Sequence, residues 1–374
     1  MMWERIEARF HDLTPRLLAT LMHPNSKIAS HVRELEVSDS SSSSKLEDNL
    51  RLVLAAIPRD RIRTFECCCQ LSTLTLQHLL QSQRKIEVLE VLTHFTTLGQ
   101  PGSSRFDSGE HHTWMNSSLR DVKSIELWIA TRSSSEERIF ERLNSISENH
   151  PRIDNLDLYS MSDRGKKLIS LCGILHHAKN IPLFSKLTSL RLFELRLGKR
   201  GDRAISKSLD LSILSCLRIS SCDNITAFIE SLSSYYTSGI GELTDLYIIL
   251  PYQLEEPENS VKAIESLLKV CPKLEDLQLD LSRHGFVAKE CILAHCQTLE
   301  CLMLGTGKSK ICSHFTVTEM TAILRACIHL KYLAVNMPAC DLGTITELGT
   351  GFHPKEEFAD MLVCVGSHHT SRIC

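Results

Sequence analysis

Five residues near the C-terminal third could take part in phosphate chemistry. Gly305-Thr-Gly-Lys-Ser309 ends like the loop in which backbone N–H groups cradle a nucleotide while Lys and Ser reach its phosphates. The first glycine of that motif should stand at 302, where Leu302 is found, and no strongly apolar helical segment starts at Ser309. We therefore expect an ordinary loop. A nucleotide-binding enzyme that uses Gly305–Ser309 is kept as the alternative hypothesis.

Cysteine and histidine are the next candidates for chemistry. The chain has 15 cysteines but no Cys-x-x-Cys pair, and the His pairs at 111–112, 176–177 and 368–369 lack a partner at metal-ligand spacing. The run Cys67–Cys69 suggests a nucleophile, but a Cys–His pair would meet only in the fold. We expect no metal site, no cofactor and no catalytic residue, so the sequence predicts a protein that is not an enzyme.

Binding chemistry is indicated by side chains that recur about every 30 residues. A charged column reads Glu36, Glu66, Glu90, Glu126, Asp157, Arg191, Arg218, and it continues without charge as Tyr247, Gln278, Met303 and Ala334. A second column, two residues further along, contains the aromatic residues Trp128, Tyr159 and Phe193. Arginine and large aromatic residues most often anchor protein interfaces. These columns predict a partner that presents a basic segment to the acids and an acidic or polar group to the arginines.

Both columns are defined by a motif that occurs eleven times: apolar, two residues, apolar, one residue, apolar. Its central residues are Leu35, Phe65, Leu89, Ile125, Leu156, Leu190, Leu217, Leu246, Leu277, Leu302 and Leu333. The alternation is typical of a strand with one buried face. Near Leu190–Leu197 a second register is open, which would put Arg196 in the charged column instead of Arg191.

Segments of helical pattern separate the motifs. They cover 45–57, 71–83, 136–147, 165–179, 226–236, 260–270, 288–296 and 318–327. Three late segments end with a cysteine three residues before the next motif, and we expect Cys271, Cys296 and Cys327 to be buried there. A fixed period of this size indicates a solenoid, in which each repeat contacts only its neighbours.

The spacing Leu-x-x-Leu-x-Leu followed by a helix resembles leucine-rich repeat proteins. The resemblance implies an α/β solenoid (horseshoe) with a parallel β-sheet on the concave face and helices on the convex face. It divides the chain into an N-terminal helical cap or linker (1–31), a repeat domain of about eleven irregular repeats (32–340), and a C-terminal cap or tail (341–374).

One copy, Leu217-Arg-Ile219-Ser-Ser-Cys222, is similar to the cysteine-containing repeat of F-box leucine-rich proteins. Most other copies depart from it, with Ala130, Met161, Leu195, Pro251 and Pro338 at the cysteine's place. We therefore expect the hydrogen-bonded ladder of that repeat to be mostly absent.

The segment Leu13–Leu35 resembles the stretch that joins an F-box to its repeats in fungal F-box-like proteins. The 31 residues before the first motif are too few for an F-box. The resemblance implies a substrate-recognition subunit, or a relic of one, in ubiquitin-dependent protein turnover, with ligase components as partners if an F-box is encoded upstream. A repeat scaffold or regulator unrelated to ubiquitin is the other alternative.

Composition narrows the classes of partner and compartment. The net charge of −3 gives no global attraction to nucleic acid or to an anionic membrane. The first residues lack the apolar stretch of a secretory signal, and no run of 18 apolar residues exists. We expect reduced cysteines and a cytoplasmic or nuclear protein.

Overall fold

The structure is a computed structural model. It describes residues 5–9, 19–21, 23, 27–38, 44–92, 121–130, 136–149, 152–161, 168–176, 183–198, 208–237, 239, 241–251, 254, 257–271, 273–281, 284–305, 315–335 and 362–364. The chain divides into two compact units. The first comprises residues 1–167, 177–187 and 374, and the second comprises 168–176 and 188–373.

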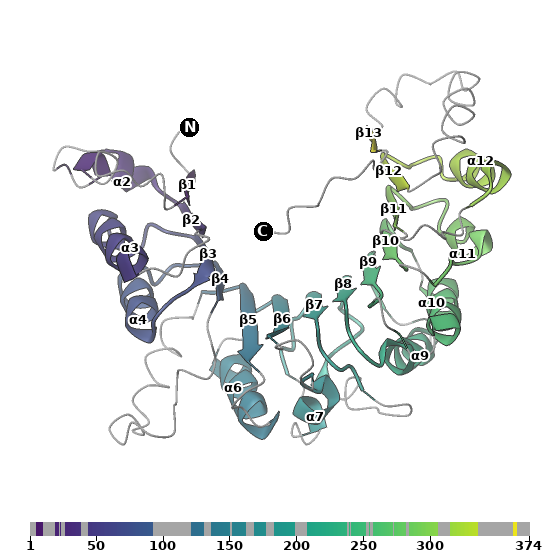
Figure 1. Cartoon of the computed structure of the whole chain (residues 1–374), viewed down its shortest axis with the longest axis horizontal. Helices are drawn as coiled ribbons and strands as arrows, with labels where there is room; N and C mark the ends of the chain where they lie inside the picture. The colour runs from purple at the N-terminus through teal and green to yellow at the C-terminus, as the bar shows by residue number, and fades with distance from the viewer. Residues whose placement is uncertain are drawn as a thin grey trace. The chain divides into compact units, whose positions relative to one another are not determined.

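The first unit pairs its strands in chain order, all parallel, with its helices on one side of them (Figure 1). Its strands are β1 (Arg5–Arg9), β2 (Glu34–Ser38), β3 (Thr64–Gln70), β4 (Val88–Leu92), β5 (Ser124–Ala130) and β6 (Asn155–Met161). Its helices are α2 (Ile28–His31), α3 (Ser44–Ala56), α4 (Thr73–Ser82) and α6 (Glu136–Asn149).

The second unit follows the same rule, with parallel strands in chain order. Its strands are β7 (Ser189–Phe193), β8 (Cys216–Ser220), β9 (Asp245–Ile249), β10 (Asp276–Asp280), β11 (Cys301–Gly305), β12 (Tyr332–Val335) and β13 (Leu362–Cys364). Its helices are α7 (Leu171–His176), α9 (Ile225–Tyr236), α10 (Pro257–Val270), α11 (Lys289–Leu293) and α12 (Val317–Ala326). The predicted α/β class with parallel strands is confirmed.

The apolar motifs form the core of each unit. Every apolar anchor of the eleven copies is buried, with at most 9% of its surface exposed. The pairing register aligns anchor with anchor, as for Leu35 with Phe65 and Leu217 with Leu246. Each fully buried side chain of this kind contributes about 1.5–3 kcal/mol as an upper limit. The predicted alternation of buried and outward positions is therefore confirmed.

The start of many of the strands is fixed by a shared carbonyl group. The oxygen of Arg33 accepts from the amides of Arg63 (2.7 Å) and Thr64 (3.1 Å), and the oxygen of Ser215 accepts from Thr244 and Asp245 (both 2.9 Å). The accepting residue directly follows the first anchor of its repeat. This bond sets the register before the strand begins, so the side chains between the anchors point to the same face in successive repeats.

Short strands lie within both terminal segments. Residues 1–31, expected as a helical cap or linker, contain strand β1 as well as α2, and Ile6 and Ala8 align with Leu35 and Val37. The C-terminal cap or tail, 341–374, contains strand β13. Neither β1 nor β13 was among the eleven copies of the motif, and each is paired with a neighbouring parallel strand.

Backbone conformation decides which residue is buried after each strand. Glu194 and Ser221 follow β7 and β8 with left-handed φ values of 53°, and the next residues, Leu195 and Cys222, are fully buried. After β9 and β10 the corresponding buried residue stands one place earlier, at Leu250 and Leu281. A residue with left-handed φ shifts the buried position after the strand by one place. The position of Cys222 therefore has a structural equivalent at the same sequence spacing in only some repeats.

Candidate partner-binding surface

The charged column of the first unit lies across adjacent strands. The register pairs Glu36 with Glu66, Glu66 with Glu90, and Glu90 with Glu126. These four side chains are half-buried and lie on the strand face opposite the anchors. Because parallel strands are about 4.8 Å apart, four like charges are stacked at short intervals. The predicted acidic column exists as a structural feature, and its binding role remains a prediction.

Two positions change the extent of that column. Asp157, predicted to face the partner, pairs with Glu126 in register but is only 5% exposed, so it is buried instead of accessible. Strand β1 adds Glu7 at the register position beside Glu36. Glu7 was not among the predicted residues of the column, because its strand was not recognised in the sequence. The aligned sequence Ile6-Glu7-Ala8, apolar on either side of an acid, was the available signal.

The aromatic residues are distributed over both units. Trp128 and Tyr159 pair directly in register on β5 and β6, and Tyr159 is half-buried. Phe193 belongs to the second unit, where it is half-buried and its register partner is Ser220. Earlier in the same column, an irregularity pairs Gln70 instead of Cys68 with Leu92.

The arginine register is settled by strand β7. Arg191 pairs with Arg218, which pairs with Tyr247 on β9. Arg196 instead bridges Ser170 and Asp223 in a separate short ladder. The register that places Arg191 in the charged column is thus confirmed, and both Leu195 and Leu197 are buried without competing for it.

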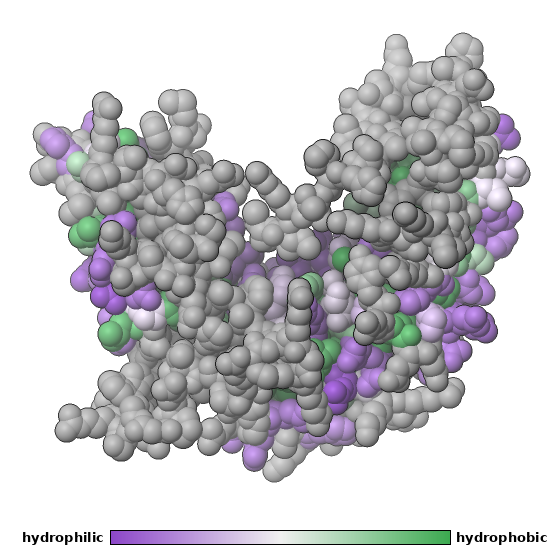
Figure 2. Space-filling model, in the orientation of Figure 1, coloured by the Kyte–Doolittle hydropathy of each residue, from purple (hydrophilic) through white to green (hydrophobic). Residues whose placement is uncertain are grey.

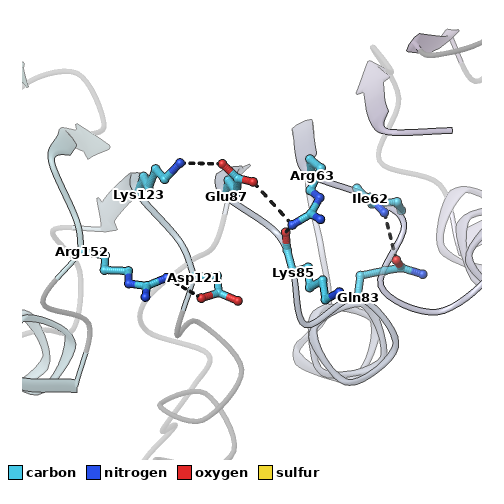
Figure 3. Close-up of polar contacts among 8 residues, drawn as sticks. All are labelled: Ile62, Arg63, Gln83, Lys85, Glu87, Asp121, Lys123 and Arg152. Carbon is cyan, nitrogen blue, oxygen red and sulfur yellow. Dashed lines mark hydrogen bonds and ion pairs between the residues drawn. The ribbon is translucent and has the colours of Figure 1, made fainter.

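A rim of charged residues borders the strand face at its amino-terminal end, and its charges alternate. Figure 3 shows Glu87 between Arg63 (3.4 Å) and Lys123 (2.7 Å). Nearby, Arg152 forms an ion pair with Asp121 at 2.9 Å. The Lys123 hydrogen bond holds the pKa of Glu87 below its usual value, against the smaller effect of burial. Exposed ion pairs stabilise a protein little. In the rim, each of these acidic side chains lies beside a basic one.

Where described residues of the helical side are visible in Figure 2, most of them are hydrophilic. Among the described residues, the large apolar side chains exposed to solvent are Leu52, Leu74 and Ile328. They are scattered single residues, as is ordinary for soluble surfaces. In the described part of the chain, the helical surface therefore has no row of aligned charged or aromatic side chains comparable with those of the strand face.

Several thiols are unsuited to nucleophilic chemistry. Burial raises the pKa of Cys222, Cys271 and Cys301 to about 12 and that of Cys327 to about 11. These thiols stay protonated at neutral pH, and Cys222 donates to the carbonyl of Leu192 at 3.5 Å. Cys222, Cys271 and Cys327 act as small apolar side chains in the core, whereas Cys301 is half-buried.

The described residues also bear on metal binding, membrane spanning and the candidate phosphate loop. In that part of the chain, no three His, Cys, Asp or Glu residues are grouped for a metal ion, and no helix is long and apolar enough to cross a membrane. Gly305 ends β11, whereas residues 306–309 of the candidate phosphate loop lie outside the described residues. A Cβ atom on Gly305 would lie 3.2 Å from Cγ of Asp280, so a carboxyl group lies directly against this glycine. Its negative charge disfavours a phosphate at that point.

The fold defines the chain as an α/β protein whose parallel strands alternate with helices that cover one face. No protein-family model matches the sequence, and no curated protein is similar to it.

Proposed function

We propose that this chain is a non-catalytic protein-interaction module, a leucine-rich repeat solenoid that captures a protein partner on the concave face formed by its strands. The observation that carries the proposal is the alignment of Glu36, Glu66, Glu90 and Glu126 on adjacent strands. A column of like charges favours a partner that presents positive charges to it over a neutral or acidic one. Surfaces with this property gain both affinity and specificity from a complementary charge.

The partner of the first unit would be a basic segment lying across the strands. Lys or Arg side chains at intervals of one strand spacing would each meet a carboxylate, while Tyr159, beside Trp128 in register, would provide an aromatic contact at the end of the column. Binding of this kind weakens as salt rises, because the face is wet and screened.

The cellular role follows from the resemblance of the repeats and of Leu13–Leu35 to fungal F-box-like proteins. In that case the chain serves as a substrate-recognition subunit, or its relic, in ubiquitin-dependent turnover in the cytoplasm or nucleus. A repeat scaffold unrelated to ubiquitin uses the same surface with a different partner. The nucleotide-binding alternative is disfavoured by the contact between Gly305 and Asp280.

Reversing two charges in the middle of the column tests the proposal. Glu66 and Glu90 are adjacent in register and half-buried, so lysines at both places fit the surface. We expect Glu66→Lys with Glu90→Lys to abolish capture of proteins that the wild-type chain retains from cell extract at low salt. Quantitative mass spectrometry of affinity-purified material measures this loss. Asp157 is unsuitable because a lysine in its buried place would disturb the fold.

The matched control changes the same total charge on the helical side of the same unit. Asp48 on α3 and Glu141 on α6 are both exposed, and Asp48→Lys with Glu141→Lys should leave the captured proteins unchanged. Circular dichroism should show both double variants folded. If the folded Glu66/Glu90 variant captures the same proteins as the wild type, the strand face of the first unit is not the binding surface.

A further inference from the structure

Two loops of the first unit carry an excess of positive charge. Residues 58–61 lie between α3 and β3, and residues 83–85 lie between α4 and β4. These loops contain one acid, Asp60, and four cations, which we call the basic platform: Arg59, Arg61, Arg84 and Lys85. All four cations are exposed. Among the residues that the structure describes, none of the four forms an ion pair or a hydrogen bond through its side chain.

Hydrogen bonds hold the two loops side by side. The amide of Asp60 donates to the carbonyl of Ser82 at 3.1 Å, and the amide of Arg61 donates to Oε1 of Gln83 at 2.8 Å. In return, Oδ1 of Asp60 accepts from the amide of Arg84 at 2.8 Å. Asp60 itself has a left-handed φ of 60°, a conformation that aspartate adopts more readily than most residues. The backbone under the platform is therefore ordered before any partner arrives, which lowers the entropic cost of binding.

The charges of the platform start from neighbouring backbone positions. Arg61 and Lys85 each stand directly before the first anchor of their repeat, and the strands that follow, β3 and β4, pair in register. Figure 3 shows Arg63 reaching the carbonyl of Lys85, a hydrogen bond of 3.2 Å. Paired strands are about 4.8 Å apart. Like charges so close favour a ligand that presents more than one negative group to them.

The surroundings of the platform favour carboxylates over a nucleic acid. Residues 58–63 and 82–87 contain no aromatic side chain on which a base could stack. Two acids, Asp60 and Glu87, interrupt the positive charge and would repel a continuous phosphate backbone. Glu87 already pairs with Arg63 and Lys123. Carboxylates on a peptide can be spaced to avoid these acids, and guanidinium forks match a carboxylate through paired hydrogen bonds.

We propose that the basic platform binds an acidic segment of a protein, whose aspartate or glutamate side chains pair with Arg59, Arg61, Arg84 and Lys85. The inference goes beyond the proposed function, because the platform belongs to the loops between helix and strand instead of the strand face. It also takes the opposite charge to that taken by the acidic column. It therefore holds whether or not the acidic column binds a partner.

The test uses the full chain and three fluorescein-labelled probes of similar length. The first is a peptide in which glutamate alternates with serine, the second has glutamine in place of every glutamate, and the third is a single-stranded oligouridine RNA. Fluorescence polarisation at low salt should show the glutamate peptide bound at least about tenfold more tightly than either other probe. Its affinity should fall as the salt concentration rises. Equal binding of the two peptides, or tighter binding of the RNA, overturns the inference.

Charge reversal locates the site. Arg61→Glu with Lys85→Glu should lower the affinity for the glutamate peptide by about tenfold or more. The control, Lys262→Glu with Arg325→Glu, makes the same change in net charge at exposed positions on α10 and α12 and should keep the wild-type affinity. Circular dichroism checks that each variant is folded. The milder Arg61→Gln with Lys85→Gln should still lower the affinity by about threefold or more. Wild-type affinity in either folded Arg61/Lys85 variant overturns the inference.

Discussion

At the scale of single residues, two buried polar side chains each link a repeat to the preceding one through hydrogen bonds to its backbone. Oε1 of Gln83 accepts from the amides of Arg61 (2.8 Å) and Ile62 (3.1 Å), while its Nε2 donates to Pro58. His295 lies between the carbonyl of Leu268 (2.8 Å) and the amide of Leu274 (3.5 Å). Each side chain stands 21 residues after the first anchor whose amide it meets. Both side chains connect one repeat to the next by hydrogen bonds to backbone groups in the interior.

The histidine can do so only when it is neutral. Nε2–H donates to Leu268, so Nδ1 must keep its lone pair for the amide of Leu274. Burial lowers the pKa of His295 from its usual 6.5, against the smaller opposing effect of the bond to Leu268. The unfolded chain takes up a proton near pH 6.5, whereas the folded chain resists it until lower pH. The stability contribution is therefore complete above pH 6.5 and is lost as the pH falls below it.

We predict that His295→Gln removes this part of the pH dependence, because glutamine can make both bonds, as Gln83 does. Urea unfolding between pH 7.5 and 5 should show a steeper loss of stability in the wild type than in the variant. His329→Gln, at an exposed position, is the control and should follow the wild type. Parallel curves for the wild type and His295→Gln would contradict the prediction.

At the scale of elements, carboxylates of one helix satisfy the first amides of the next. Glu47 on α3 accepts from the amide of Ser72, the N-cap of α4, at 2.9 Å, and from the hydroxyl groups of Ser72 and Thr75. Burial raises the pKa of Glu47, but these bonds and the charge of Arg51 outweigh it and hold the pKa below its usual value. Glu265 on α10 similarly accepts from the amide of Ala288 before α11 at 2.7 Å. A negative charge at a helix N-terminus also stabilises the helix by its favourable interaction with the helix dipole.

We predict that Ser72→Ala destabilises the protein more than Thr316→Ala does. Both residues are N-caps whose hydroxyl groups accept a backbone amide, but the Ser72 hydroxyl also donates to the partly buried Glu47. Its loss should cost about 1–2 kcal/mol, since it combines a cap with a bond to a charged group. Thr316 has only the exposed capping box with Glu319. Chemical unfolding followed by circular dichroism compares the two variants, and equal losses would show that the link between helices adds nothing.

At the scale of the whole molecule, repeats contact their neighbours, so damage should remain local. Leu277 is fully buried between Leu246 and Leu302 in the second unit. An aspartate there should cost at least about 3 kcal/mol, from the lost apolar contacts and an unpaired buried charge. In a nearest-neighbour system this loss falls first on the adjacent repeats.

All three tryptophans, Trp3, Trp114 and Trp128, belong to the first unit, so their fluorescence reports on that unit alone. We predict that Leu277→Asp lowers the unfolding midpoint seen by far-ultraviolet circular dichroism more than the midpoint seen by tryptophan fluorescence. Leu277→Met conserves volume and should leave both nearly unchanged. An equal shift of the two midpoints in Leu277→Asp would show that the two units unfold as one.

Much of the architecture could be predicted from the sequence because the signal is local and repeated. The apolar motif marks a strand at each copy, and the residues between its anchors must then face the other way. The helices were also recognisable, although α7 and α11 proved shorter than 165–179 and 288–296. The expected burial held for Cys271 and Cys327, but Cys296 is only half-buried because the neighbouring His295 occupies the interior.

The sequence by itself determined which residues form strands and which of them share a face, because alternation with a period of two is a property of each short segment. Only the tertiary structure decided which outward residues are accessible. It buried Asp157, paired Glu7 with the acidic column through β1, which no copy of the motif predicted, and placed Arg191 rather than Arg196 beside Arg218. Exposure and pairing depend on neighbours about 30 residues away along the chain, and no local pattern contains that information.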